Sequence, residues 1–581
     1  MAHRRVRPCR SATIATVNRS LLALGALCAA LAVSGVAGQS AASYDLLITN
    51  GRVLDGSGNP WFPADVAVKD GRIVAVGRLG GGTATTVIDA TGKYVTPGFI
   101  DIHSHADDGS SPDGGLRDTN RARRAAPNLV SQGITTVVVN QDGRSPWPIR
   151  DQKSLLEKQG IGINALLLVG HGTVRRMVMK DDVKRPSTAA EQARMRELLR
   201  QGLQDGAVGL SAGLEYEPGR WSTTDEIVEM ARELPAVDGI YISHERSEGS
   251  DPLWYVPSQD GPGPPTLLDA VRETIEIGEK TGARVVASHL KAKGENYWGS
   301  SAAAVGLIQR ARDRGVDIWS DQYPYPTSGT DGSTVLIPAW ATRAPGATGA
   351  PAPGSRAQML KRVLGDPSTE KQVRSDIAHE IRRRGGAHNI VVFDYSDKSL
   401  YGKPLSEIAA GWKLDPVDAA IRIQMDGLDR PGGARMRGFS MAEWDMEHIA
   451  KQEWVATSTD GGIALPEDGP STHARFYGSF TRKISYYAIE RGVITLEHAV
   501  RAATTLPAQI MRLKDRGAIR EGMAADIVVF DAQRIRDKAT FFEPHQHSEG
   551  VEQVFVNGVA RVRDGRLVDE LPGRVLTRTA Q

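Results

Sequence analysis

The middle of the chain contains eight short apolar segments, several of them separated by stretches with helical periodicity. Alternating strands and crossover helices are typical of a parallel sheet, and eight such units predict a closed TIM-type (β/α)8 barrel. The predicted strands are 94–103, 133–139, 164–171, 206–212, 239–245, 284–290, 316–323 and 454–460. We therefore assign the chain to the α/β class.

Titratable side chains follow the apolar part of these segments. In a barrel of this kind the reactive groups sit at the carboxyl ends of the strands. The residues found there are His103, His105, Asp142, His171, His244, His289, Asp321 and Asp460. Their shared placement predicts one polar site at one end of the barrel.

Both ends of the chain have the texture of short strands joined by tight turns. Asn-Gly and Asp-Gly pairs, which favour two-residue hairpin turns, lie between apolar runs at 50–51, 70–71, 557–558 and 564–565. We expect 43–95 and 511–571 to form one small β-sandwich domain. The barrel, 96–510, would then be an insertion into that domain, and 572–581 would be a tail.

Two stretches interrupt the barrel pattern. The segment 249–265 is rich in proline and glycine, and 338–434 contains a similar run followed by helical and strand-like text. Both fall between predicted strands, at the face where a substrate would enter. Long ordered loops at that face often act as lids.

The first 42 residues have the pattern of a signal peptide. Five arginines precede an apolar run from 21 to about 36, and small residues follow it. A membrane anchor is the alternative, but the run is shorter than the roughly 20 residues that a spanning helix needs. We expect export to the periplasm or the medium, by the Sec or the Tat route.

The cysteines constrain any metal site. The only two, Cys9 and Cys28, lie inside the predicted leader. The exported chain would have no disulfide, and its metal ligands would have to be His, Asp, Glu or a modified Lys.

The charge is nearly balanced, with 71 Lys and Arg residues against 69 Asp and Glu residues. This balance gives no support to a nucleic-acid partner. We expect a small-molecule substrate and no stable membrane association after the leader is removed.

The strand-end histidines predict a metal site. His103 and His105 are two residues apart on a strand, so both imidazoles point to the same side. His244, His289 and Asp460 follow three other strands. Any one of these residues alone is more often a packed or solvated side chain. Together they form a donor set that suits one or two divalent ions such as Zn²⁺.

The predicted chemistry is hydrolysis. A bound metal lowers the pKa of its water towards about 7 and polarises a carbonyl. Asp460 would act as general base and then as general acid, passing a proton to the leaving nitrogen. A binding protein that kept only the fold is the alternative, and in it we would expect some of the ligands to be lost.

Several motifs resemble those of the N-acyl-D-amino-acid deacylase (D-aminoacylase) branch of the amidohydrolase superfamily. PGFIDIHSH is typical of the superfamily, whereas YISHERSEG, ASHLK and DQYPY together indicate the branch. The resemblance extends over nearly the whole chain after the leader. It implies a metal-dependent enzyme that cleaves the amide bond of N-acyl amino acids, with a preference for the D-isomer.

The resemblance also implies roles for single residues. His103 and His105 would bind the first metal, His244 and His289 the second and tighter one, and Asp460 would be the catalytic carboxylate near the first metal. The expected substrate-binding residues are Lys291, Arg475 in HARFYG, and either Tyr323 or Tyr325 of DQYPY. Arg475 would suit a carboxylate by bidentate pairing.

One position departs from the family pattern. The second strand of the family usually ends in Asn-Cys-Gly, with the cysteine as a zinc ligand, whereas this chain has Asn140-Gln141-Asp142-Gly143. Aligned without gaps, Asp142 takes the place of the cysteine. It would serve as a bridging carboxylate, with an ordinary turn residue as the alternative. A carboxylate is harder than a thiolate and would favour two occupied metal positions or a metal other than zinc.

The superfamily motifs identify the residues of the hydrolytic site more firmly than they identify the substrate. Another carbon–nitrogen hydrolase therefore stays open as an alternative: a dipeptidase, a hydantoinase-like cyclic amidase or a xenobiotic amidase.

Overall fold

The computed structural model describes residues 43–80, 82–107, 114–329, 334–343, 354–428, 434–470 and 472–578. The predicted signal peptide, 1–42, lies outside the described residues. Within the described ranges, no helix combines the length and apolarity needed to cross a membrane.

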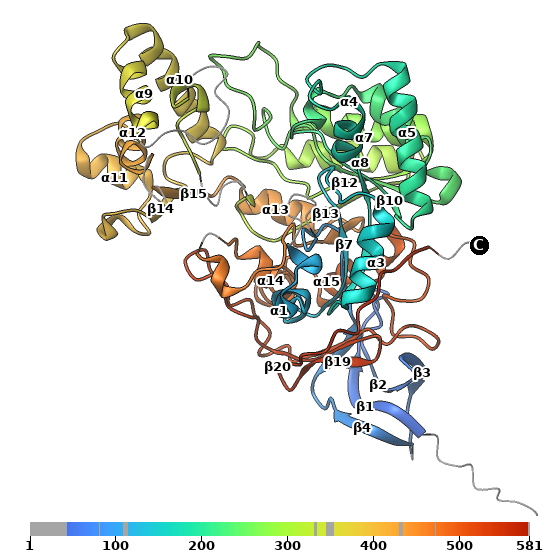
Figure 1. Cartoon of the computed structure of the whole chain (residues 1–581). Helices are drawn as coiled ribbons and strands as arrows, with labels where there is room; N and C mark the ends of the chain where they lie inside the picture. Colours follow the sequence, from blue (N-terminus) through green and yellow to red (C-terminus); the bar gives the residue numbers. More distant parts are fainter. Residues whose placement is uncertain are drawn as a thin grey trace, which may run out of the picture.

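Eight strand positions close into a barrel whose strands run parallel (Figure 1). The strands are β6 (Phe99–Asp101), β7 (Ile134–Val139), β8 (Asn164–Leu167) continued by β9 (Val169–Gly170), β10 (Gly209–Gly213), β11 (Ile240–His244), β12 (Arg284–Ala287), β13 (Ile318–Gln322) and β16 (Val455–Thr457). The hydrogen-bonded orders are β6-β7-β8 and β9-β10-β11-β12-β13-β16. A parallel bridge between Ser104 and Gly461 joins the last strand to the first.

Helices cover the outside of the barrel because each buries one apolar face against the strands. They are α1 (Arg121–Arg124), α2 (Pro127–Val130), α3 (Ile149–Gln159), α4 (His171–Met179), α5 (Ala189–Gln204), α6 (Thr224–Ala231), α7 (Leu267–Thr281), α8 (Ser301–Asp313), α13 (Glu443–Ala450), α14 (Arg475–Arg482), α15 (Leu496–Ala503) and α16 (Thr505–Ile510). Capping boxes at Thr188 and Thr266 start α5 and α7.

The two chain ends share one mixed sheet at the foot of the barrel (Figure 1). Its strands are β1 (Ser43–Val53), β2 (Phe62–Lys69), β3 (Arg72–Gly77), β4 (Thr83–Asp89), β5 (Tyr94–Pro97), β17 (Ile527–Phe530), β18 (Val551–Val556), β19 (Val559–Arg563) and β20 (Arg566–Leu567). β5 lies between β1 and β17 and so joins the two halves. The predicted fold class, a barrel with a small β domain made by both chain ends, is confirmed.

The first predicted strand, 94–103, is wrong as a single strand. It divides at Gly98 into β5 of the terminal sheet and β6 of the barrel. The Gly98 N–H donates to Asp526 O, and a Cβ on Gly98 would lie 2.3 Å from Thr135 Oγ1. Only a glycine fits at this close approach, so the chain changes sheets within one residue.

The predicted insertion at 338–434 contains a helical lobe that stands apart from the barrel (Figure 1). Its elements are α9 (Ser355–Leu364), α10 (Pro367–Arg383), α11 (Leu405–Trp412), α12 (Pro416–Gly427), β14 (Ile390–Asp394) and β15 (Arg435–Gly438). The lobe has an apolar core of its own, which includes Leu360, Ile377, Ile390 and Leu405.

The predicted loop 249–265 forms neither helix nor strand and is held by the helical lobe. Arg383 of α10 donates to Asp251 Oδ1 at 3.2 Å and to Pro252 O at 2.7 Å. Asp376 of α10 accepts from Ser258 N at 3.0 Å. The two interruptions of the barrel pattern are therefore one connected structure.

Candidate metal centre

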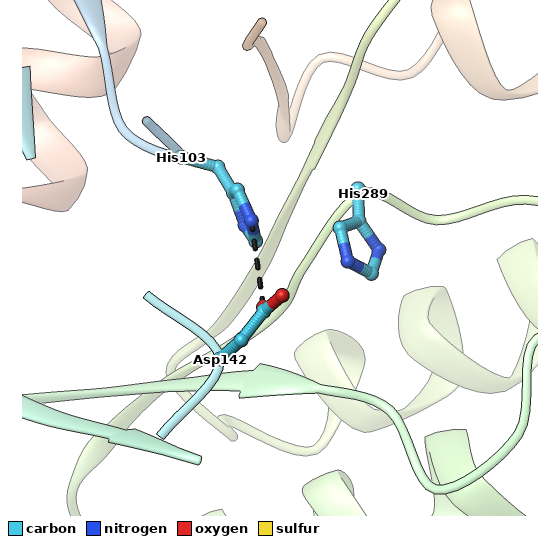
Figure 2. A group of neighbouring side chains, drawn as sticks. All are labelled: His103, Asp142 and His289. Carbon is cyan, nitrogen blue, oxygen red and sulfur yellow. Dashed lines mark ion pairs between the residues drawn. The ribbon is translucent and has the colours of Figure 1, made fainter. Parts of the chain in front are cut away.

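Four histidines and two aspartates from five barrel strands converge at the carboxyl ends of the strands. His103 Nε2 lies 3.6 Å from Asp142 Oδ1 and 3.5 Å from Asp460 Oδ1. His105 Nε2 lies 3.2 Å from the same Asp460 oxygen. Figure 2 shows His103 pointing at Asp142, with His289 beside the pair on the segment that follows β12.

The second pair of histidines meets the same aspartate. His244 Nδ1 lies 3.5 Å from Asp142 Oδ1 and 2.7 Å from His289 Nε2. Asp142 therefore lies within 3.6 Å of His103, His105 and His244. A bridging carboxylate would occupy such a central position. An ordinary turn residue would not require these three imidazoles around its side chain.

The donor set fits a divalent metal. Three groups have donor atoms that all lie within 4.8 Å of one another: His103–Asp142–His289, His103–His105–Asp460 and His244–Glu248–His289. His103 Nε2 and Asp142 Oδ1 are buried and have no hydrogen-bond partner among the described residues. Buried polar atoms without partners are costly, and a cation bound by both would satisfy them. Imidazole and carboxylate are natural ligands of zinc and similar ions.

Charged groups of both signs surround the site and shift the pKa values of its residues. Burial lowers the pKa of His244, but Asp142, Glu215 and Glu248 outweigh it and raise the pKa to about 10. Burial likewise raises the pKa of Asp460, yet the charge of Arg475 and the neighbouring imidazoles hold it well below its usual range. Asp460 is therefore ionised at neutral pH.

Hydrogen bonds behind the histidines fix their orientation. His103 Nδ1 contacts Ser288 Oγ, which donates to Asp321 at 2.7 Å. His289 Nδ1 lies 2.9 Å from Lys291 Nζ. Ser288 can accept from His103 Nδ1, and this tautomer leaves Nε2 of His103 free to bind a metal.

The backbone is unusual at three of the converging residues. Asp142, His289 and Asp460 have positive φ angles of 57°, 37° and 45°. Side chains other than glycine rarely adopt this region, and such conformations cluster at functional sites. The positive φ angles therefore occur at three of the residues whose side chains converge in the cluster.

Glu215 is a positioning residue that the sequence analysis did not single out. It follows β10 and is buried. Its Oε2 lies 3.2 Å from His244 Nε2, and its Oε1 accepts from Leu253 N at 2.7 Å. One carboxylate thus joins a candidate metal ligand to the loop 249–265. Its place directly after a barrel strand is the signal that could have singled it out.

Replacing Glu215 with glutamine is expected to weaken zinc binding about 10- to 100-fold. An amide has one acceptor atom, so it cannot accept from His244 Nε2 and Leu253 N together. Asp376→Asn is the matched control, because Asp376 holds Ser258 of the same loop and contacts none of the histidines. Zinc affinity measured by competition with a chelator tests this. Equal losses in both variants would show that Glu215 acts through the loop alone.

The structure separates the two candidate tyrosines. Within the part of the chain that the structure describes, Tyr323 Oη is buried without a hydrogen-bond partner. Its ring lies beside Lys291 Nζ and the Arg475 guanidinium, at 5.3 and 4.7 Å. Tyr325 Oη instead donates to Asp537 at 3.1 Å. Tyr323 is therefore the tyrosine that the fold brings to the site.

Two cationic groups flank the cluster. Arg475 Nη1 donates to Asp460 Oδ2 at 2.6 Å, while Arg475 Nε is buried and has no hydrogen-bond partner within the described ranges. Lys291 Nζ donates to Glu248, four residues after His244. Glu248 was also missed by the sequence reasoning, although it lies in the same YISHERSEG motif.

Two other histidines have structural contacts. His171 Nε2 lies 2.8 Å from Glu226 Oε1, and Arg175 contacts the same carboxylate. His473 accepts from Arg475 N at 3.0 Å and contacts Thr327 O. His473 thereby orients the start of α14, which carries Arg475.

Comparisons with known proteins show the family of this chain. The amidohydrolase family model matches residues 86–236 and 439–562. An N-acyl-D-glutamate deacylase of Alcaligenes xylosoxydans xylosoxydans is 35% identical over 558 residues, 92% of this chain and 97% of the relative.

Solved structures extend the comparison to the metal site. A D-aminoacylase with a binuclear metal centre aligns with a TM-score of 0.68 and 30% identity, over 92% of this chain and all of its own. An N-acyl-D-glutamate deacylase from Bordetella bronchiseptica, complexed with zinc and a phosphonate mimic of the tetrahedral intermediate, aligns with a TM-score of 0.68 and 32% identity over the same shares.

Proposed function

We propose, on the premise that this chain belongs to the amidohydrolases and within them to the N-acyl-D-amino-acid deacylase family, that it hydrolyses N-acyl-D-amino acids to a carboxylate and a free D-amino acid. One observation carries this assignment. Beside the metal-binding cluster, Arg475 Nε and Tyr323 Oη are buried donors without partners among the described residues. They would bind the α-carboxylate of an amino-acid substrate.

Zn²⁺ is the cofactor that the donor set and the family favour. We propose that His244 and His289 hold the tighter ion, that His103 and His105 with Asp460 hold the second, and that Asp142 bridges them. A divalent ion bound there lowers the pKa of a coordinated water and polarises the scissile carbonyl.

The residues of the chain supply the remaining chemistry. Asp460 is ionised and lies within 3.5 Å of both His103 and His105, so it is placed to take the proton of the attacking water. The same carboxyl group would then deliver that proton to the leaving nitrogen. Arg475, bound to Asp460 through Nη1, would hold the substrate carboxylate and orient the amide towards Asp460.

Stereochemical preference provides the test of the function. The zinc-loaded protein is expected to hydrolyse at least one of N-acetyl-D-methionine, N-acetyl-D-glutamate and N-acetyl-D-aspartate about a hundredfold faster than its L-isomer. Release of the free amino acid would be measured by amine derivatisation. Chelation should abolish the activity and Zn²⁺ should restore it. Equal rates for both isomers, or no hydrolysis of any, would refute the assignment.

Export is a separate proposal that rests on the leader. The arginines and the apolar run in the first 42 residues support action in the periplasm or outside the cell. Mass spectrometry of the secreted or periplasmic protein would find an N-terminus near residues 38–42 if the leader is cleaved as proposed.

A further inference from the structure

A cavity of about 340 Å³ adjoins the metal-binding cluster on one side. Asp142 forms part of its wall, and so does Tyr216, whose ring centroid lies 4.3 Å from that of His244. The remaining lining residues are Gly143, Arg144, Gly172, Thr173, Arg176, Gly213, Glu217, Pro218 and Gly219. Its volume falls within the range of small-molecule pockets, roughly 300–1,000 Å³.

Two arginines, Arg144 and Arg176, line this cavity beside the carboxylates of Asp142 and Glu217. Arg144 lies over the Tyr216 ring at 5.9 Å, and Arg176 donates to the backbone oxygen of Glu217. Within the described residues, no carboxylate lies within 4.0 Å of either guanidinium. The Glu217 carboxylate lies 3.7 Å from Lys184 instead. Asp142 faces the histidines of the cluster, so both arginines keep donors for an anion.

The cavity lies across the barrel from the proposed carboxylate site. Its lining residues follow β7, β9 and β10, the second to fourth strand positions. Lys291, Tyr323 and Arg475 follow β12, β13 and β16, the sixth to eighth positions. In a closed barrel of eight strands these two groups face each other, with the metal-binding cluster between them.

This arrangement determines how a bound N-acyl amino acid would be oriented in the site. An N-acyl amino acid carries its α-carboxylate on one side of the scissile carbonyl and its acyl chain on the other. With the α-carboxylate held by Arg475, the acyl chain extends into the cavity. An acetyl group would fill little of that volume and would leave both guanidinium groups unused.

We propose that this cavity is an acyl-chain subsite for a second carboxylate, so that the preferred substrates are N-dicarboxylyl-D-amino acids such as N-succinyl or N-glutaryl derivatives. Arg144 and Arg176 would pair with the distal carboxylate. Hydrolysis would release a dicarboxylic acid and the free D-amino acid, with water as the only co-reactant. The inference rests on the proposed deacylase function and assigns its acyl specificity.

The test compares two acyl groups of equal size. N-succinyl and N-succinamoyl derivatives of the best-accepted D-amino acid differ only in a terminal carboxylate against a terminal amide. The wild-type enzyme is expected to favour the succinyl substrate about tenfold or more in kcat/KM, since each guanidinium adds a charge-assisted hydrogen bond. In the double variant Arg144→Gln, Arg176→Gln the ratio should fall to about 1.

Arg194→Gln is the matched control, because Arg194 is an exposed arginine of α5 that does not line the cavity. It should leave the wild-type ratio in place. A ratio near 1 in the wild-type enzyme overturns the subsite, and so does a ratio that the double variant does not lower.

Selective loss of N-acetyl-D-glutamate turnover relative to N-acetyl-D-glutamine in the double variant, with the succinyl preference retained, would assign the arginines to the amino-acid side chain instead. Hydrolysis of the N-acetyl substrate without succinyl preference refutes only the subsite, whereas no hydrolysis of any substrate refutes the deacylase function as well.

Discussion

Replacing Asp460 with asparagine is expected to lower kcat about a thousandfold while the protein retains the zinc ion proposed to be held by His244 and His289. The amide keeps an oxygen and nearly the same shape, so the contacts of His103 and His105 lose little. It cannot accept the proton of the attacking water, because it has no basic carboxylate. Steady-state kinetics, with metal content determined on the same sample, separate the two effects.

The control for this substitution is Asp313→Asn, because Asp313 is an exposed carboxylate of α8 that accepts a hydrogen bond from Gln309. It should leave kcat unchanged. If Asp460→Asn kept more than about a tenth of the wild-type kcat, the proton would have to move through another group, against the role assigned to Asp460.

Replacing Asp142 with alanine is expected to reduce zinc affinity by about a hundredfold or more and to remove most of the activity. Asp142 lies near three histidines at once, so its loss disconnects the two proposed metal positions. Asp142→Cys should recover metal binding, because a thiolate is also a zinc ligand and stands at this position in the family. Metal analysis after dialysis against trace zinc measures both.

The positive φ of Asp142 requires a control, because substitution there could act through the backbone and not through the metal. Asp142 has a φ of 57°, and the turn residue Asp238 has a φ of 55° and no place in the cluster. Asp238→Ala removes a carboxylate from the same backbone conformation. Unchanged metal content and activity in Asp142→Ala, or an equal loss in Asp238→Ala, would reduce Asp142 to an ordinary turn residue.

The sequence predicted features that depend on short-range patterns. Apolar runs located all eight barrel strands, and histidines at i and i+2 predicted that His103 and His105 share a side. The Asp-Gly pairs at 70–71 and 564–565 and the Asn-Gly pair at 557–558 form hairpin turns as predicted. The predicted turn at Asn50-Gly51 is wrong, because these residues lie inside β1 at a register shift in its pairing with β2. Each of these signals extends over a few residues and reflects local backbone geometry.

Features that depend on packing between distant segments were not predictable in this way. The choice of Tyr323 over Tyr325 follows from the contact of Tyr325 with Asp537, 212 residues away. Glu215 acquires its role from His244 and Leu253, which the fold brings together. The division at Gly98 depends on Asp526, which comes after the whole barrel segment in the sequence.

The division at Gly98 also has a consequence for how the molecule loses its structure. β5 belongs to the sheet built from both chain ends, and β6, one residue later, leads directly to His103. No linker separates β5 from β6, so unfolding of the terminal sheet would displace the strand that leads to His103. β5 is paired with β17 near the carboxyl end, so clipping the chain after the barrel would also remove support from the first histidine pair. The terminal strands and the metal centre therefore belong to one cooperative unfolding unit, in which the metal strengthens the sheet and the sheet retains the metal.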